Sequence, residues 1–229
     1  MRYTFSSDQV DFAASARSVF AKHCAPEAQR ALWDDETGRS PALWTAIGEL
    51  GLPSILVPEE HDGFGGTLAD LLPVLEEVGR SAVPDAVLEA VVLGPLALAL
   101  GAAAEHQERW LPGVAAGEVR VTARLRAGSP VPDAHVSDLV VIADKGDLWV
   151  YRRDELDVER QFSQDPSRRL FSVRPRPGAG ERLPSGRRAL PLLRAHELVG
   201  SAAVLNGISA RVLHDTVAYA KERQQFDRV

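Results

Sequence analysis

The stretch Val119-Arg120-Val121-Thr122-Ala123-Arg124-Leu125 alternates apolar with mostly polar residues, and the pattern of the chain changes at this point. Such alternation is typical of a β-strand with one buried face. Before it, and again after about residue 188, apolar residues recur at the spacing of an amphipathic helix. The sequence therefore predicts an α+β, mainly helical fold. We expect an N-terminal helical domain over 1–117, a small, mostly antiparallel β-domain over 118–187, and the first long helix of an incomplete C-terminal helical domain over 188–229.

Capping residues mark the expected helix ends in the first part of the chain. Ser7 is expected to cap a helix that ends before Pro26, because a serine hydroxyl can accept a hydrogen bond from a free amide of the first turn. Ser40-Pro41 and Thr67 are expected to open two further helices, and Gly51 to end the first of these.

The segment 86–104 is almost wholly apolar and about long enough to span a bilayer. Glu89 lies inside it, and the Gly94-Pro95 pair is expected to break a helix in its middle. The sequence therefore favours two helices buried in the protein core over a membrane span.

Four short apolar stretches in the middle region are expected to form strands: 119–125, 139–142, 148–151 and 170–173. After about Arg188, apolar residues are dense enough to predict a helix that is buried on more than one side. An incomplete helical domain would leave part of this apolar stripe without partners in the same chain, so we expect an oligomer.

Composition excludes several classes of protein. The chain of 229 residues carries 26 Lys and Arg against 32 Asp and Glu, a net charge of −6, which opposes binding to nucleic acid or to an anionic membrane surface. A single cysteine, Cys24, excludes an internal disulfide, and its place on an apolar helix face predicts a buried, inert thiol. With no signal-peptide pattern at its start, the chain is expected to be cytoplasmic.

Common catalytic and metal-binding motifs are absent from the sequence. The histidines are scattered, and the adjacent pairs His196-Glu197 and His214-Asp215 would point in different directions on a helix, so no metal site is expected. The glycine-rich run Gly63-Phe64-Gly65-Gly66 before a helix start has two interpretations. It could hold an anion on free amides, or it could be a tight turn that needs positive φ, which is the interpretation that we favour.

Several motifs, in order along the chain, carry a resemblance to a known family. They are PEEHDGFGGT at 58–67, VLEEVGR at 74–80, RWLP at 109–112, AGE at 116–118 and YAKERQQFDR at 219–228. Together they resemble the acyl-CoA dehydrogenase family. The resemblance implies a flavin oxidoreductase of lipid metabolism and fatty acid β-oxidation, which uses FAD to oxidise the Cα–Cβ bond of an acyl-CoA thioester. A carboxylate base removes the α-proton in such an enzyme.

The family's spacing suggests which residue could be that base. In a minority of members the glutamate precedes the Y-A-x-x-R motif on the same helix, and counting back from Tyr219 reaches Glu197. Burial on an apolar helix would move a glutamate pKa toward the range that a base needs. The alternative is that Glu197 is a solvated helix residue or pairs with Arg194.

The resemblance also implies cofactor-binding residues at the end of the chain. Arg223, Gln225 and Phe226 match family positions that reach the FAD of a neighbouring subunit, and an arginine fork suits a diphosphate. The alternative is a basic helix end that complements the helix dipole.

Three departures from the family pattern leave the activity of this chain open. The segment 122–130 has no T-E-P motif, the later W-I-T strand is missing, and Asp227 replaces a glycine. We therefore expect either an acyl-CoA dehydrogenase, active alone or only with a partner chain, or a non-catalytic subunit that completes a partner's FAD site. A homo-oligomer and a hetero-oligomer with another acyl-CoA dehydrogenase subunit both fit, and a helical interaction module without a cofactor is a third hypothesis.

Overall fold

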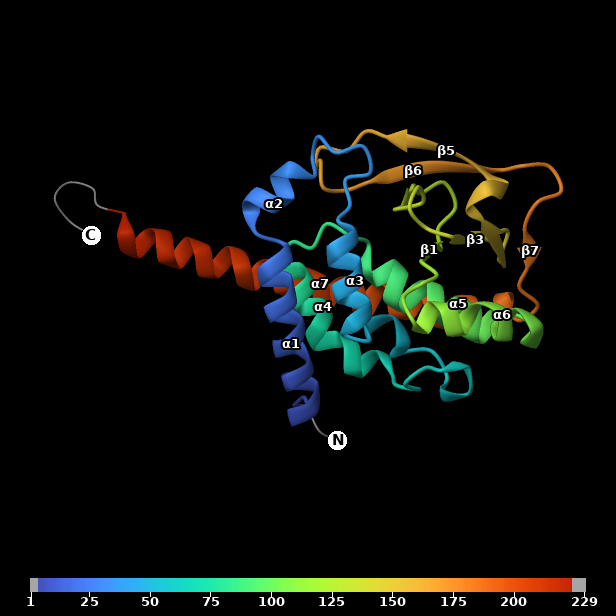
Figure 1. Ribbon diagram of the computed structural model, residues 1–229, viewed down its shortest axis with the longest axis horizontal. Coiled ribbons are helices and arrows are strands. Elements are labelled where there is room, and N and C mark those ends of the chain that lie inside the picture. The colour runs from blue at the N-terminus through green and yellow to red at the C-terminus, as the bar shows by residue number, and fades with distance from the viewer. Residues whose placement is uncertain (1–3, 224–229) are drawn as a thin grey trace.

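The computed structural model describes residues 4–223 of the chain, and it confirms the α+β, mainly helical fold. The α-helices are α1 (Ser7–His23), α2 (Pro26–Ala31), α3 (Pro41–Glu49), α4 (Leu68–Arg80), α5 (Gly94–Gly101), α6 (Ala104–Ala115) and α7 (Gly186–Glu222). Shorter helical segments are η1 (Leu52–Ser54), η2 (Glu59–His61), η3 (Leu88–Leu93) and η4 (Arg153–Glu155). The strands lie between α6 and α7, and they form a layer on one side of the helices (Figure 1).

The strands form two small sheets. They are β1 (Val121–Arg124), β2 (Val131–Pro132), β3 (Leu139–Asp144), β4 (Asp147–Arg152), β5 (Leu156–Gln161), β6 (Leu170–Pro175) and β7 (Glu181–Arg182). One sheet has the order β1-β3-β4-β7 and the other has the order β2-β6-β5. Only the pairing of β1 with β3 is parallel among the described strands, so the region is mostly antiparallel, as predicted. The four predicted strands are present, whereas the sequence did not predict β5, which has mostly exposed side chains, or the two-residue strands β2 and β7.

The predicted helix starts agree with the structure to within one residue. Thr67 and Asp70 cap α4 reciprocally, and the Ser40 hydroxyl accepts from the Leu43 amide at 3.3 Å. At the first helix the prediction is wrong by one position, because Ser6 is the cap and Ser7 is the first helical residue. The Gln9 backbone amide donates to the Ser6 hydroxyl at 3.2 Å, and the Ser6 backbone amide donates to Gln9 Oε1 at 2.9 Å.

The predicted helix break at Gly94-Pro95 does not occur. The chain stays helical from η3 into α5, and η3 is a π-helix. Proline has no amide hydrogen and its ring collides with the carbonyl four residues earlier. A π-turn just before Pro95 widens the helix there, so the proline is accommodated without a break. No helix within residues 4–223 is both long and apolar enough to cross a membrane.

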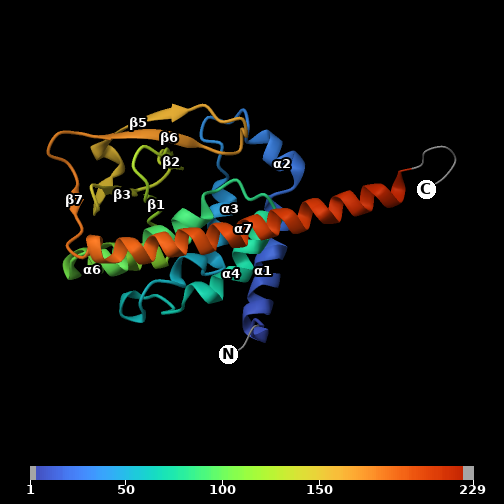
Figure 2. The same cartoon turned by 180° about the vertical axis from the view of Figure 1, so that it is seen from behind.

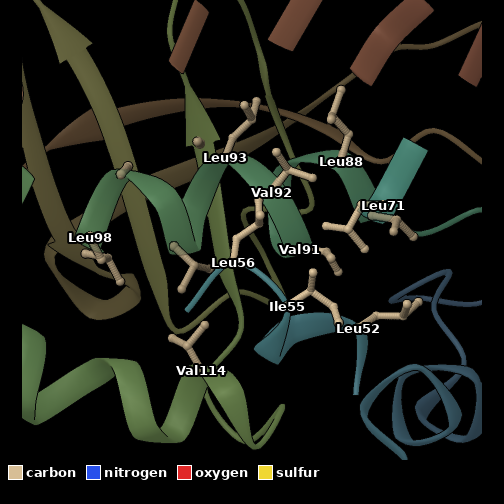
Figure 3. Packing of buried hydrophobic residues seen from close by; sticks show 14 of the residues in the cluster. Leu52, Ile55, Leu56, Leu71, Leu88, Val91, Val92, Leu93, Leu98 and Val114 are labelled. Atoms are coloured by element: carbon tan, nitrogen blue, oxygen red, sulfur yellow. The ribbon is translucent and has the colours of Figure 1, made fainter. Parts of the chain in front are cut away.

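Buried apolar side chains from both layers meet in one large cluster. Leu71 of α4, Val91 of η3 and Val114 of α6 contribute to it (Figure 3), and residues of β1, β3 and β4 extend it. A second, smaller cluster lies between the two sheets and includes Val140 and Phe171. The large cluster contains residues from both sides of the boundary predicted near residue 118, and the division into domains stays a prediction.

The prediction that the last helix is buried on more than one side is wrong for this chain alone. One face of α7 packs on α4, α5 and η3, with Leu193 and Ala203 buried. Other large apolar side chains are open to solvent, including Leu198 at 60% exposure and Leu205 at 61%. The second half of α7 projects beyond the other helices (Figure 2). The apolar stripe therefore has too few partners within the described residues.

Candidate functional site

A pocket of about 290 Å³ lies where the two layers meet α7. Its walls come from α4, the segment 83–89, the loop before β3, the loop before β6, and the middle of α7. Apolar lining residues are Val78, Val83, Val87, Leu88, Val204, Leu205 and Ile208. Charged lining residues are Arg39, Asp85, Glu89, Asp133, Arg168 and Arg169. We call this space the interlayer pocket; it combines an apolar wall with a charged one, as small-molecule sites commonly do.

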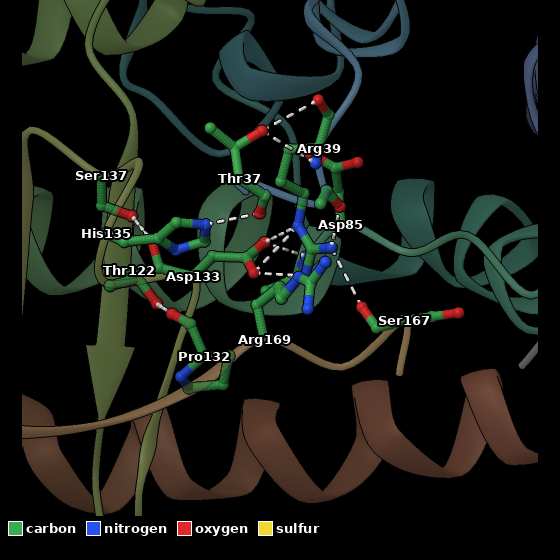
Figure 4. Close-up of polar contacts among 12 residues, drawn as sticks. Thr37, Arg39, Asp85, Thr122, Pro132, Asp133, His135, Ser137, Ser167 and Arg169 are labelled. Atoms are coloured by element: carbon green, nitrogen blue, oxygen red, sulfur yellow. Dashed lines mark hydrogen bonds and ion pairs between the residues drawn. The ribbon is translucent and has the colours of Figure 1, made fainter. Parts of the chain in front are cut away.

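A buried ion pair forms the charged wall between the helices and the strands. The Arg39 guanidinium donates to the Asp133 carboxylate in a forked arrangement, with Nε at 3.0 Å from each carboxylate oxygen (Figure 4). Asp133 also accepts from the Ala86 amide at 2.8 Å. Both side chains are buried, so removing either one would leave the other as an uncompensated charge. The pair therefore fixes the positions of the loop before α3, the segment just before η3 and the loop after β2 relative to one another.

A second buried pair lies beside the first. Arg120 Nη2 donates to Asp85 Oδ1 at 3.0 Å, and the Arg120 guanidinium lies 3.8 Å from the centroid of the Trp44 ring. The other oxygen of Asp85 has no hydrogen-bond partner among the described residues. Burial raises the pKa of Asp85 to about 6, although the charge of Arg120 acts in the opposite direction.

Arg169 is the most deeply buried charged residue of this wall, with 1% exposure. Its Nη2 donates to the carbonyls of Leu32, Trp33 and Asp35, and so ties the loop after α2 to the strand layer. Its Nε and Nη1 have no acceptor within residues 4–223. Gly38, with φ of +62°, makes room for this guanidinium, since a Cβ there would lie 1.9 Å from Arg169 Nε.

Glu89, at the start of the π-helix η3, is the lone acid on the apolar segment that the sequence singled out. Glu89 lines the interlayer pocket, and burial raises the pKa of its carboxyl to about 6. The negative charges of Asp133 and Glu197 act in the same direction, and the charge of Arg168 acts against it. The sequence used Glu89 only as an argument against a membrane span and did not predict its place in a pocket.

Glu197, the predicted base, is half-buried on α7. It is not among the residues that line the interlayer pocket, but it lies one helical turn from Ser201, which is. Arg194 donates to the Leu125 carbonyl at 3.3 Å, so its recorded hydrogen bond is to the strand layer rather than to Glu197. The role of Glu197 stays a prediction.

Of the predicted cofactor-binding residues, Arg223 alone is described. It is exposed directly after α7, with its guanidinium 5.4 Å from the centroid of the Tyr219 ring and a hydrogen bond to the Tyr219 hydroxyl. A solvent-facing guanidinium at this place could contact an anionic group of a second subunit. Gln225 and Phe226 lie outside the described residues, so this assignment also stays a prediction.

The glycine-rich run 63–66 is a tight turn rather than an anion cradle. The amides of Phe64, Gly65 and Gly66 donate to the carbonyls of Ser54, Val57 and Ile55 at 2.8–2.9 Å, so none is free for an anion. Gly65 has φ of +67°, as the favoured interpretation required. Cys24 is buried as expected, and burial raises the pKa of its thiol to about 12.

Comparisons of the sequence and of the structure with known proteins both point to one family. The family "Acyl-CoA dehydrogenase, N-terminal domain" matches residues 6–118. Acyl-CoA dehydrogenase IpdE2 of Mycolicibacterium smegmatis is 34% identical over 215 residues, which cover 92% of this chain and 64% of that protein. This chain belongs to the acyl-CoA dehydrogenase family. It spans slightly less than two thirds of the length of the relative.

Two solved structures show how far the fold is shared. A structure described as a Tcur3481-Tcur3483 steroid ACAD variant has a TM-score of 0.85 and 25% identity, covering 96% of this chain and 68% of that one. The ChsE4-ChsE5 complex from Mycobacterium tuberculosis has a TM-score of 0.88 and 22% identity, covering 100% and 70%. Both descriptions name two different chains.

Proposed function

We propose that this chain is one subunit of a two-chain, FAD-dependent acyl-CoA dehydrogenase and that its interlayer pocket receives the acyl group. The observation that carries the proposal is the pocket itself, which has an apolar wall for an acyl chain and lies between α7 and the strand layer. The hetero-oligomeric relatives support a partner chain, and one of them is described as a steroid ACAD. A steroid-derived acyl group is therefore a candidate substrate.

The residues described here fit a flavin cofactor in part. Arg223 offers an exposed cation for a diphosphate. The loop after β1 offers only open space around Gly128, because a Cβ there would meet no atom within 4 Å. FAD supplies the hydride acceptor when it is bound. This chain's own residues would hold the acyl group in the pocket and, at Glu197, accept the α-proton on a carboxylate oxygen.

A second candidate function follows from the exposed stripe of α7 and from the missing T-E-P motif. In that case the chain is a non-catalytic subunit, and it completes a partner's FAD site and stabilises the oligomer. The stripe needs a covering surface in either case. The two functions differ in whether a residue of this chain takes part in proton transfer.

One experiment separates the two functions. The chain is purified alone and with a co-purifying acyl-CoA dehydrogenase subunit, and the flavin spectrum is recorded before and after anaerobic addition of an acyl-CoA. If this chain is catalytic, Glu197→Gln keeps the bound flavin but loses its bleaching by substrate. If bleaching is unchanged in that variant, the non-catalytic function is correct. No flavin under any condition would refute both and leave an interaction module.

A further inference from the structure

Three polar side chains from three separate elements line the interlayer pocket without bonding to one another or to other described side chains. They are Glu89 of η3, Arg168 of the loop before β6, and Ser201 of α7. Within residues 4–223, none of these side chains makes a hydrogen bond or an ion pair with another residue. All three residues line this one pocket, and the positive charge of Arg168 partly offsets the rise that burial causes in the pKa of Glu89.

The free hydroxyl of Ser201 is unusual on this helix. Ser209 and Thr216, farther along α7, each donate to the carbonyl four residues earlier, at 2.8 and 2.7 Å. That bond is the usual way for a helical hydroxyl to be satisfied. Ser201 lacks it and lines the pocket instead, so its hydroxyl is available to a ligand.

The rest of the wall near these groups is apolar, and this restricts the ligand. A hydrocarbon that filled the space beside Leu88 and Val204 would exclude water from the Glu89 carboxyl and offer no hydrogen bond in exchange. Leaving a buried polar group unpaired is costly, and more so when the group is charged. A ligand that brings its own polar group would avoid this cost.

The signs of the surrounding charges indicate which polar group fits. A ligand carboxylate would meet Glu89, Asp85 and Asp133, and a ligand ammonium would meet Arg39 and Arg168. A neutral hydroxyl is compatible with both signs, because it donates to a carboxylate oxygen and accepts from a guanidinium or a serine hydroxyl.

We propose that Glu89 is a specificity-determining residue that selects acyl groups carrying a hydroxyl on the part that enters the interlayer pocket. In this arrangement the ligand hydroxyl donates to Glu89 and accepts from Ser201 or Arg168. The proposal rests on the proposed function, because it assigns the acyl group to this pocket. It adds the class of acyl group, which is oxygenated rather than purely hydrocarbon.

The test compares ligands that differ by one hydroxyl. The probes are decanoyl-CoA and a series of hydroxydecanoyl-CoA esters whose hydroxyl moves along the chain from C5 to C10. Dissociation constants are measured by calorimetry on the purified chain together with its partner subunit. The variants are Glu89→Gln, Glu89→Leu and Ser201→Ala, with Glu49→Gln on the exposed side of α3 as the matched control.

For the wild type and Glu49→Gln, we expect one hydroxyl position to bind at least about tenfold more tightly than decanoyl-CoA, as for a hydrogen bond to a charged group. Glu89→Leu should lose this preference and bind decanoyl-CoA more tightly than the wild type does, and Glu89→Gln should keep part of the preference. If decanoyl-CoA binds and no hydroxyl position is preferred, the selection by Glu89 is wrong while the proposed function stands. If no ester binds any form, both are wrong. Should Glu89→Leu fail to fold, the near-isosteric glutamine variant and Ser201→Ala decide the result.

Discussion

Buried charge in this protein is organised in two ways at the residue scale. Arg39 and Arg120 each face a buried aspartate, and each pair joins the helical layer to the strand layer. Among the described residues Glu89 has no such partner, although it lines the same pocket as both pairs' aspartates. A paired charge is a structural connection, whereas an unpaired one in a pocket wall is a cost that a ligand can relieve.

The unpaired state of Glu89 predicts a pH-dependent stability. Its pKa is raised from an ordinary 4.5 to about 6, so the folded state binds more protons than the unfolded state between these values. The free energy of unfolding should therefore fall as pH rises through this window. Glu89→Gln removes the titration, so relative to the wild type it should gain about 1 kcal/mol between pH 5 and pH 7.5. Urea unfolding at the two pH values measures this, and Glu49→Gln should show no such gain.

Arg223 carries the prediction about the cofactor. If its guanidinium contacts the FAD diphosphate of a neighbouring subunit, Arg223→Ala should weaken flavin binding by about 1.5–3 kcal/mol, or one to two powers of ten. Arg223→Lys should recover only part, because an ammonium cannot form the fork. The control is Arg211→Ala, since Arg211 binds Asp215 of the same helix at 2.7 Å. Equal flavin affinity for the two alanine variants, in a fluorescence titration with the partner present, would refute the contact.

At the scale of elements, glycines set the close approach of α4 and α7. A Cβ at Gly207 would lie 1.8 Å from the Glu76 carbonyl oxygen, and one at Gly79 would lie 2.0 Å from the Val204 carbonyl oxygen. Gly79 lies inside α4, one residue before its end. A glycine can end a helix, or it can allow a second helix to approach closely. Both roles depend on the missing side chain, so the sequence alone does not distinguish them.

The close contact between α4 and α7 predicts that alanine has opposite effects on stability at two glycines, one inside this contact and one outside it. Gly207→Ala should destabilise the protein by about 1–3 kcal/mol, because α7 must move away from α4 to admit the methyl group. Gly48→Ala in α3 is the matched control, since the nearest atom to its Cβ would be 3.8 Å away. That change should stabilise the protein by about 0.5–1 kcal/mol through helix propensity. Thermal or urea unfolding distinguishes them, and equal effects would show that the crossing tolerates a side chain.

At the scale of the whole molecule, the sequence predicted the layers but not the pocket between them. Periodicity located the helices and four strands because each pattern is local. The edge strand β5 was missed because Leu156 and Val158 are its only apolar residues, and its last three residues are exposed and polar. The interlayer pocket joins Arg39, Glu89, Asp133 and Ser201, which are far apart in the chain, so no local pattern could reveal it. The degree of burial of α7 depends on the surface that covers its apolar stripe, and the described residues of this chain do not supply that surface.

The exposed stripe of α7 predicts that assembly depends on this helix. Leu198, Leu205, Val212 and Tyr219 follow one another at intervals of seven residues and are all exposed, so they lie along one line of the helix. Leu198→Glu together with Val212→Glu places two charges on this line. In an assembly that buries it, each charge would cost several kilocalories per mole, so the complex should dissociate to single chains at micromolar concentration.

The control is Phe162→Glu, because Phe162 is 89% exposed and belongs to the loop after β5 rather than to α7. Sedimentation velocity of the wild type, the double variant and the control, each with its partner subunit, gives the measurement. We expect the control to sediment like the wild type and the double variant to sediment more slowly, with an unchanged far-ultraviolet circular dichroism spectrum. If the double variant assembles as the wild type does, another surface holds the subunits together, and the stripe is exposed in the assembly as well.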